Sequence, residues 1–229
     1  MNLLITKKVD AIILVGSTYV NDNDEDNKYI VDAAAQVPVM LLNGALDAPN
    51  VYSILSDDYA SVYNATLYMI NSGVHDILYY YNSISYSVKK KIAGFKAAMT
   101  AKNLPLTDAM LQYYPDNRED IPRIAEHLQR IADHVTTFHG VIAADDTLAI
   151  GACKYAHNAG LRIPEDLSII GYNNSMLVNC CTPDLTSIDN KLENLCQHLI
   201  STLMGTLSGN EMPKQTVFSG ELIVRGTTL

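Results

Sequence analysis

Short apolar runs alternate along the chain with segments whose apolar residues recur at helical spacing. The run Gly140–Ala144 is followed by apolar residues every three or four positions up to Gly160, a residue type that commonly ends helices. After Pro164, the run Leu167–Tyr172 has the composition of a second buried strand. A strand, a helix and a strand in this order predict a parallel pair joined by a right-handed crossover.

The same alternation continues on both sides of this unit. Further strands are predicted at residues 9–15, 37–43, 51–55, 76–81, 109–113 and 215–224, and further helices at 25–36, 58–72, 88–99, 121–131 and 192–203. Because strands and helices alternate without long linkers, the sequence predicts an α/β fold with doubly wound parallel sheets.

Polar residues follow two of the predicted strands directly. Asp145, Asp146 and Thr147 come after the first, and Asn173 and Asn174 come after the second. Parallel sheets bind ligands at the carboxyl ends of their strands, so these side chains are expected where a small molecule is held. Asp146 has an alternative interpretation as the residue that caps the following helix.

The composition narrows the possible functions. Asp and Glu number 25 against 16 Lys and Arg, which gives a net charge of −9 over 229 residues. Phosphate binding depends on clustered basic residues, so we expect no nucleic-acid surface on this polypeptide. The four cysteines show no spacing typical of a disulfide framework, which predicts a reduced protein. The N-terminus lacks the order of a signal peptide, and no apolar run approaches the ~18 residues of a membrane helix. We therefore expect a cytoplasmic protein outside the membrane.

Sequence signatures of catalysis are missing. The chain has no Gly-x-Ser-x-Gly elbow, no phosphate-cradling glycine loop, no Cys-x-x-Cys and no His-Glu-x-x-His. The six histidines share no ligand spacing, and His127 and His134, two turns apart on one predicted helix, are interpreted as a solvated pair. We therefore expect no enzyme activity, no cofactor and no metal.

Residues 143–174, AADDTLAIGACKYAHNAGLRIPEDLSIIGYNN, and residues 182–188, TPDLTSI, carry a longer pattern. This pattern resembles the effector-binding domain of the lactose-repressor (LacI/GalR) family of bacterial transcription regulators. The resemblance extends to both ends of the chain, because VDAIILVGS, VPVMLLN, KKKIAGFKAAM and ELIVRGTT fall at successive strand and helix positions of that family.

The resemblance implies an α/β fold of two doubly wound parallel-sheet subdomains, periplasmic-binding-protein-like (type I), with an incomplete amino subdomain. The amino subdomain would comprise residues 1–55 and 190–214, and the carboxyl subdomain would comprise residues 56–189 and 215–229. The family binds a small-molecule effector in the cleft between them and forms homodimers. It contacts operator DNA through a headpiece that lies before the segment present here, so we expect the chain to be a fragment of a longer regulator.

By the same resemblance, residues of both subdomains face the effector. They are Ser17, Ser85, Ser87, Lys91, Tyr114, Asp145, Thr147, Asn173 and Leu192. A turn-forming role remains open for Ser17, and core packing of a leucine stripe remains open for Leu192.

Two of these positions depart from the family pattern. Lys91 stands where the family usually has an arginine, so a single ammonium replaces a bidentate guanidinium. Asn173 stands where sugar-responsive relatives commonly have an aspartate, and an amide both donates and accepts. The resemblance therefore implies a small polar effector, with a carbohydrate as the first candidate.

The predicted function is an effector-sensing and dimerising domain of a LacI-type transcriptional regulator. The alternative is a solute-binding protein of a sugar transporter, which shares the architecture. The N-terminus without signal-peptide order and the terminal VRGTT count against that alternative. An enzyme is the third possibility, since acid and base pairs in a cleft need no motif.

Overall fold

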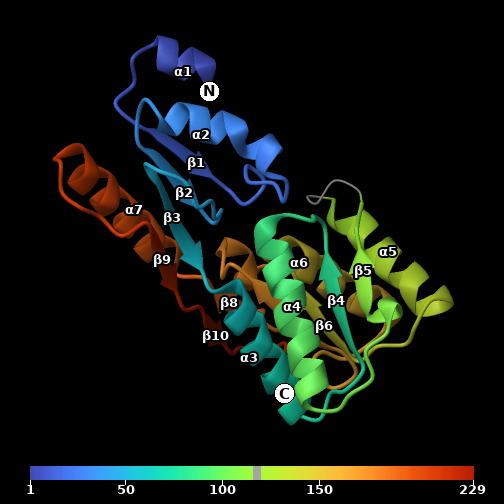
Figure 1. Ribbon diagram of the computed structural model, residues 1–229. Helices are drawn as coiled ribbons and strands as arrows, with labels where there is room; N and C mark the ends of the chain where they lie inside the picture. The colour runs from blue at the N-terminus through green and yellow to red at the C-terminus, as the bar shows by residue number, and fades with distance from the viewer. Residues whose placement is uncertain (116–119) are drawn as a thin grey trace. The chain divides into compact units, whose positions relative to one another are not determined.

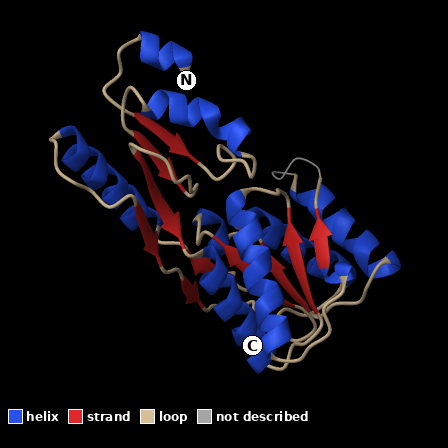
Figure 2. Ribbon diagram, viewed as in Figure 1, coloured by secondary structure: helices blue, strands red, loops and turns tan. Residues whose placement is uncertain are grey.

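The computed structural model describes residues 1–115 and 120–229, and the chain divides into two compact units (Figures 1 and 2). The smaller unit comprises residues 1–57, 85–89 and 191–219, and the larger unit comprises residues 58–84, 90–190 and 220–229. Each unit is built around its own sheet. The predicted α/β fold with two mainly parallel sheets is therefore confirmed.

The smaller unit contains a four-stranded parallel sheet in the order β1-β2-β3-β9. Its elements are β1 (Ile12–Val15), β2 (Val39–Leu42), β3 (Val51–Ser56), β9 (Gln215–Phe218), α1 (Asn2–Thr6), the 3-10 helix η1 (Asp24–Asn27), α2 (Lys28–Ala34) and α7 (Leu192–Leu207). Successive residues of β2 point to opposite faces, so Leu41 packs with α2 whereas Met40 packs with α7. Leu195 and Leu199 of the predicted leucine stripe are buried in the second of these layers.

The larger unit contains a six-stranded sheet in the order β10-β8-β7-β6-β4-β5. Its strands are β4 (Ile77–Tyr81), β5 (Leu111–Tyr113), β6 (Gly140–Ala143), β7 (Ser168–Tyr172), β8 (Thr186–Asp189) and β10 (Glu221–Ile223). Its helices are α3 (Asp58–Asn71), α4 (Tyr86–Ala101), η2 (Asp108–Met110), α5 (Ile121–His134), α6 (Asp146–Ala159) and η3 (Met176–Asn179), and the first turn of α4, up to residue 89, belongs to the smaller unit. Strand β10 runs antiparallel to β8, and the other pairs are parallel.

Helices cover both faces of the six-stranded sheet, with α3 and α4 on one side and α5 and α6 on the other (Figure 1). Glycines allow these helices to approach closely. A Cβ at Gly94 of α4 would lie 2.3 Å from the Tyr59 backbone oxygen of α3, and one at Gly151 of α6 would lie 2.1 Å from the Ile124 side chain of α5. Because glycine has no side chain, Gly94 allows the close approach of α4 to α3, and Gly151 allows that of α6 to α5.

The tail differs from the single strand predicted at residues 215–224. Strand β9 pairs with β3 in the smaller sheet, and β10 pairs with β8 in the larger sheet. Residues 215–218 therefore do not belong with the carboxyl subdomain, to which the sequence analysis assigned all of 215–229. The chain changes sheets near Gly220, where an added Cβ would meet the Ser61 hydroxyl oxygen at 2.5 Å. The pairing of β9 with β3 satisfies the backbone hydrogen-bonding groups along one edge of β3. The apolar pattern of the sequence does not encode this requirement.

Two shorter segments also differ from prediction. The helix predicted at residues 25–36 begins as η1 and becomes α-helical at Lys28. Buried Asn27 explains this start, because its side chain accepts from the Asn21 amide and donates to the Asn21 carbonyl oxygen, each at 2.8 Å. The strand predicted at residues 109–113 is shortened to β5, because its first residues belong to η2.

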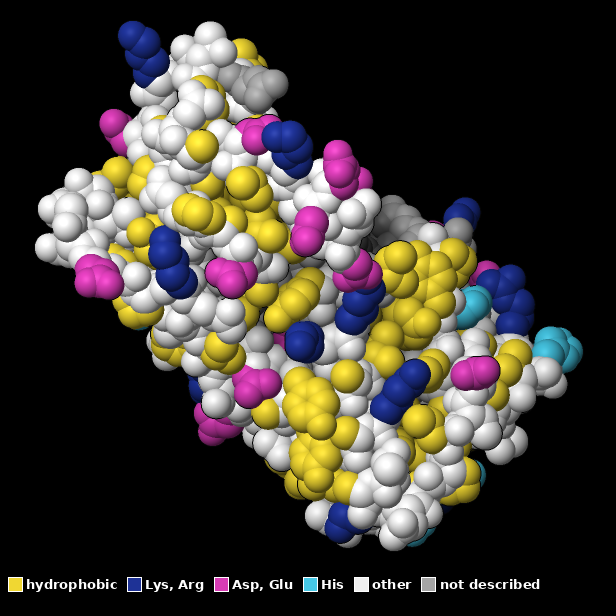
Figure 3. Space-filling view, viewed as in Figure 1, with side chains coloured by type: hydrophobic (Ala, Val, Ile, Leu, Met, Phe, Trp, Pro, Cys, Tyr) yellow, Lys and Arg dark blue, Asp and Glu magenta, His cyan; other side chains and the backbone are white. Residues whose placement is uncertain are grey.

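The face drawn in Figure 3 agrees with the acidic composition. Figure 3 shows one face of the molecule, on which Lys and Arg side chains are dispersed among Asp and Glu without a continuous basic patch among the coloured residues. Phosphate-binding surfaces need such a patch. Within residues 1–115 and 120–229, no helix has the length and apolar character needed to cross a membrane.

We expect amide hydrogens of β4 and β7 to exchange more slowly than those of β1. Strands β4 and β7 have a neighbour on each side, whereas β1 is at an edge of its sheet. Hydrogen-exchange mass spectrometry should show stronger protection at Ile77–Tyr80 and Ile169–Gly171 than at Ile12–Val15. Faster exchange in the two central strands than in β1 would contradict this expectation.

Replacing Gly94 with alanine should lower the free energy of unfolding by about 1–3 kcal/mol, despite the better helix propensity of alanine. The new methyl group would overlap the backbone oxygen of Tyr59, which has no rotamer to escape into. Urea denaturation measures the loss. Ala93→Ser, at the exposed neighbouring position of α4, is the control and should change stability by about 0.5 kcal/mol or less. A Gly94→Ala protein as stable as the parent would show that α3 and α4 separate without cost.

Candidate functional site

The carboxyl ends of β4, β6, β7 and β8 lie along one edge of the larger sheet, because these strands are parallel neighbours. A hollow of about 340 Å³ opens beyond the ends of β6 and β7. Its lining combines polar with apolar side chains, namely those of Asp145, Asp146, Thr147, Asn173, Ser175, Met176 and Leu177. All of these residues belong to the larger unit.

Asp145 is the N-cap residue of α6. One carboxylate oxygen accepts from the Leu148 amide at 2.9 Å, and the other accepts from the Asn82 side-chain amide at 3.0 Å. Asn82 follows β4, so Asp145 connects the ends of two neighbouring strands. A carboxylate has about four acceptor sites, so Asp145 retains capacity for a ligand hydroxyl.

Asp146 is 2% exposed and bonds across the sheet edge, while Asp145 caps the helix. Its Oδ1 accepts from the Ser187 hydroxyl at 2.6 Å, and its Oδ2 accepts from the Ser175 amide and hydroxyl at 2.7 and 2.8 Å. Burial raises the pKa of Asp146, and these hydrogen bonds oppose that shift. A Cβ at Gly171 would lie 2.4 Å from Oδ1, so glycine makes room for the carboxylate.

Two successive asparagines turn the chain after β7. Asn173 and Asn174 have φ values of 98° and 48°, in the region that favours glycine and that asparagine tolerates better than most residues. The Asn174 amide donates to the Ser187 hydroxyl at 3.0 Å, and its side-chain oxygen accepts from Arg225 at 2.7 Å. This turn leaves Asn173 exposed at the rim, where its side-chain oxygen accepts from Asn190 at 3.1 Å.

Lys91 lies behind the hollow and is 5% exposed. Its ammonium donates to the Ala144 carbonyl oxygen at 3.0 Å and lies 3.4 Å from the centroid of the Tyr172 ring. The Tyr172 hydroxyl in turn donates to the buried carboxylate of Asp58. A cation, an aromatic ring and a carboxylate are thus stacked beneath the ends of β6 and β7.

The surroundings of Lys91 act on the pKa of its ammonium in opposite directions. Burial lowers the pKa of the Lys91 ammonium, and the carboxylates of Asp58, Asp145 and Asp146 oppose that shift. The network thereby offsets part of the cost of a buried cation. A lysine donates as a point charge without the planar fork of an arginine, so its geometry suits one acceptor oxygen at a time.

The structure separates the predicted site residues into three groups. Asp145, Thr147 and Asn173 line the hollow, Lys91 is buried behind it, and Tyr114 is buried elsewhere in the larger unit. The third group, Ser17, Ser85, Ser87 and Leu192, belongs to the smaller unit. Leu192 is 51% exposed at the first turn of α7, in contrast to the buried leucines that follow it.

Tyr114 is 1% exposed and packs among aromatic side chains. Its ring centroid lies 6.1 Å from that of Tyr80 and 5.5 Å from that of His127. The Tyr80 hydroxyl and His127 Nδ1 are 2.8 Å apart, so His127 does not form a solvated pair with exposed His134 as the sequence analysis had it. Helical spacing alone does not show that α5 turns His127 towards two tyrosines. No group of three or more His, Cys, Asp or Glu residues in the described part of the chain is placed to hold a metal.

Sequence reasoning missed several residues of this network, including Ser175 and Ser187, which donate hydrogen bonds to Asp146. Asn82 and Asn190 directly follow β4 and β8, so the strand-end rule that identified Asp145 could have found them. Asp58 and Tyr172 offered no comparable signal, because their hydrogen bond joins positions 114 residues apart.

Replacing Asp146 with asparagine should alter how folding depends on pH. In the parent, the pKa of Asp146 is higher in the folded than in the unfolded state, where it is 3.8. This difference stabilises the fold at pH values below 3.8, and the stabilisation is lost as pH rises through the folded-state pKa. Asp146→Asn lacks this titration. Its free energy of unfolding relative to the parent should therefore increase as pH rises through that range, as urea denaturation can measure.

A second variant tests the cause of the Asp146 shift. Ser187→Ala removes a hydrogen bond that lowers the pKa of Asp146, so the loss of stability with rising pH should become steeper. A difference between parent and Asp146→Asn that stays constant with pH would show that Asp146 does not titrate in this way.

Known proteins resemble this chain in sequence and in fold. A model of the periplasmic binding protein-like domain matches residues 66–228. An HTH-type transcriptional regulator of Lachnoclostridium phytofermentans is 47% identical over 228 residues, covering 100% of this chain and 68% of the relative. The HTH-type transcriptional regulator AscG of Escherichia coli is 27% identical over 228 residues, covering 99% of this chain and 66% of AscG.

Solved structures also resemble this chain. A sugar-binding transcriptional regulator of the LacI family from Escherichia coli, complexed with phosphate, matches with a TM-score of 0.84 at 25% identity, covering 100% of this chain and 80% of that one. The chain spans 68% and 66% of the length of the two curated relatives. We conclude from the matched domain, the similarity to these regulators and the two-sheet α/β fold that the chain belongs to the LacI family of transcriptional regulators and matches their effector-binding region.

Proposed function

We propose that this chain senses a neutral, hydroxyl-rich small molecule of the sugar class for a LacI-family regulator. The observation that carries the proposal is the hollow at the ends of β6 and β7, where several hydrogen-bonding side chains and two apolar ones meet. Ligands of doubly wound sheets bind at this edge. The name of the Escherichia coli neighbour, a sugar-binding regulator, supports the same ligand class.

The chemistry of the lining favours a neutral ligand. Asp145 and Asp146 place negative charge beside the hollow and would repel an anion, whereas carboxylates readily accept hydrogen bonds from hydroxyl groups. Asn173 can both donate and accept. Met176 is 89% exposed and supplies an apolar surface for the carbon face of a ring, as Leu177 does beside it. A sugar presents both kinds of surface at once.

The remaining predicted residues stay part of the proposal on the strength of the family resemblance. Lys91 would supply positive charge behind the hollow, and Tyr114 would pack against Tyr80 and His127. Ser17, Ser85, Ser87 and Leu192 remain candidate ligand contacts by the same resemblance.

Sensing would act through linkage. A ligand that binds one conformation of the effector domain more tightly shifts the population towards that conformation, and operator affinity changes with it. In this proposal the regulator works in the cytoplasm as a homodimer, and DNA is bound by a separate headpiece. The transporter alternative is not favoured, because the curated relatives are transcriptional regulators.

Asn173→Ala should weaken the binding of a sugar ligand about five- to tenfold, because roughly one net hydrogen bond of about 1 kcal/mol is lost. A thermal-shift screen of neutral sugars against sugar phosphates would identify the ligand, and calorimetry would measure its affinity. The proposal predicts that the neutral sugars shift the melting temperature more than their phosphates do.

Lys91→Ala provides the second arm of the experiment. Lys91 does not line the hollow, and its ammonium donates to the Ala144 carbonyl oxygen directly before Asp145. Such a charge-assisted hydrogen bond contributes roughly 1.5–3 kcal/mol, so its loss should disturb the strand end that carries Asp145 and weaken binding by up to about a hundredfold. Lys90→Ala, at the exposed neighbouring position of α4, should bind like the parent. If the ligand binds Asn173→Ala and Lys91→Ala as tightly as the parent, and circular dichroism shows both folded, the site assignment is wrong.

A further inference from the structure

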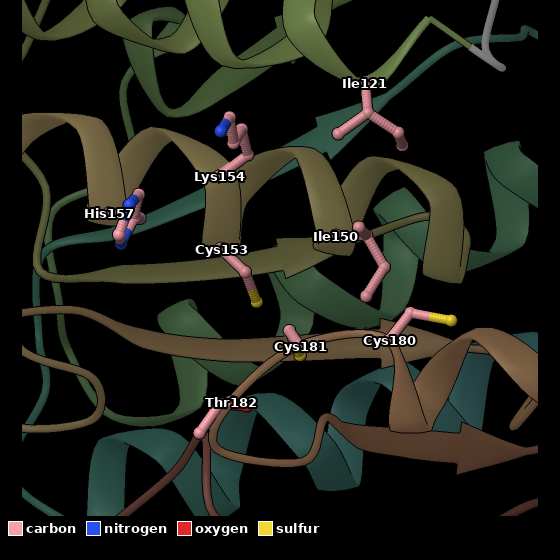
Figure 4. A pocket seen from close by; sticks show the side chains of 8 residues that line it. All are labelled: Ile121, Ile150, Cys153, Lys154, His157, Cys180, Cys181 and Thr182. Atoms are coloured by element: carbon pink, nitrogen blue, oxygen red, sulfur yellow. The ribbon is translucent and has the colours of Figure 1, made fainter.

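A second hollow of the larger unit, about 360 Å³ in volume, gathers three of the four cysteines (Figure 4). Cys153 lies in the middle of α6, and Cys180 and Cys181 lie after η3. All four cysteines are free thiols. The proposed ligand site uses none of them, so their convergence calls for a separate account.

Cys153 and Cys181 form a directly interacting pair. Cys153 is 6% exposed and Cys181 is half-buried, and both side chains line the same hollow. Figure 4 shows the Cys153 side chain directed from α6 towards Cys181. The Cys181 thiol donates to the Pro183 carbonyl oxygen at 3.2 Å. One sulfur is therefore reachable from solvent while its partner is enclosed beside it.

The two thiols differ in acidity. The interaction with the Cys153 side chain lowers the pKa of the Cys181 thiol, while burial and the carboxylates of Asp184 and Asp146 oppose that shift. The same interaction, together with burial, raises the pKa of Cys153. The thiolate is the reactive form of cysteine, and Cys181 is also the more exposed of the two thiols, so we expect Cys181 to act as the nucleophile of the pair.

The other two cysteines lack this arrangement. Cys180 is exposed, and its sulfur lies 3.9 Å from the Met176 carbonyl oxygen. Cys196 is exposed on α7 of the smaller unit. A metal site does not explain the cluster either, because no set of three His, Cys, Asp or Glu residues among those described has the geometry to bind an ion.

We propose that Cys181 is a site of oxidation by hydroperoxides and that Cys153 completes the reaction by forming an intramolecular disulfide with it. Oxidation-sensitive cysteines in general are accessible, readily ionised and adjacent to a second thiol. The hollow provides access to Cys181, and α6 directs the Cys153 thiol towards it from the same hollow. This inference does not depend on the proposed ligand.

The chemistry proceeds in two steps. The Cys181 thiolate attacks one oxygen of the hydroperoxide, the O–O bond breaks, and the departing alkoxide or hydroxide takes up a proton, which leaves a sulfenic acid on Cys181. The Cys153 sulfur then attacks the Cys181 sulfur, the S–O bond breaks, and the released hydroxide leaves as water with the proton of Cys153. The two thiols supply both electrons that reduce the peroxide.

The test uses the whole chain, reduced, freed of reductant and treated with hydrogen peroxide under nitrogen. After alkylation of the remaining thiols, peptide mass spectrometry without reduction should find one cross-link joining Cys153 to Cys181, which dithiothreitol reverses. Cys181 should lose alkylation severalfold faster than Cys180 or Cys196. Non-reducing electrophoresis should show no covalent dimer.

Two variants sharpen the result. Cys153→Ala should stop the reaction at a sulfenic acid on Cys181, which dimedone traps, whereas Cys180→Ala should form the same cross-link as the parent. Faster oxidation of Cys180, a disulfide between two chains, or an unmodified Cys153 after Cys181 has reacted would each overturn the proposal. Mapping of the parent decides these outcomes even if Cys153→Ala fails to fold.

Discussion

The buried carboxylate of Asp146 holds the candidate site together. Hydrogen bonds from Ser175 and Ser187 join the first turn of α6, the loop after β7 and strand β8 at this single group. A buried carboxylate is costly unless its acceptor capacity is filled, and these bonds fill much of it. The contact also requires glycine at position 171, so the composition of β7 depends on a side chain from another element.

The last residues of the chain complete this arrangement. Arg225 donates to the Asn174 side chain and to the Leu185 carbonyl oxygen, and the Thr227 hydroxyl donates to the Ile169 carbonyl oxygen at 2.7 Å. The Thr186 amide donates back to Thr227 at 2.9 Å. The tail therefore holds β7 and β8 together, and the turn that presents Asn173 depends on Arg225, which is 51 positions from Asn174.

Helix α6 connects the two proposed sites. Its first turn contributes Asp146 to the ligand hollow, and Cys153 lies about two turns later on the same helix. The loop after β7 runs from Ser175 in the first hollow to Cys181 in the second. A disulfide between Cys153 and Cys181 would tie this helix to this loop, so oxidation and ligand binding would act on the same pair of elements.

The sequence by itself determined most of the strands and helices, although not β8 or the division of the tail into β9 and β10, and it determined the strand-end positions of Asp145 and Asn173. Apolar spacing reports which side of each element is buried, and parallel neighbours must end at the same edge of a sheet. Only the tertiary structure decided that Asp146 bridges two loops, that Tyr114 is enclosed, and that residues 215–218 join the smaller sheet. These outcomes depend on contacts between residues far apart in the chain, and local patterns of polarity do not encode such contacts.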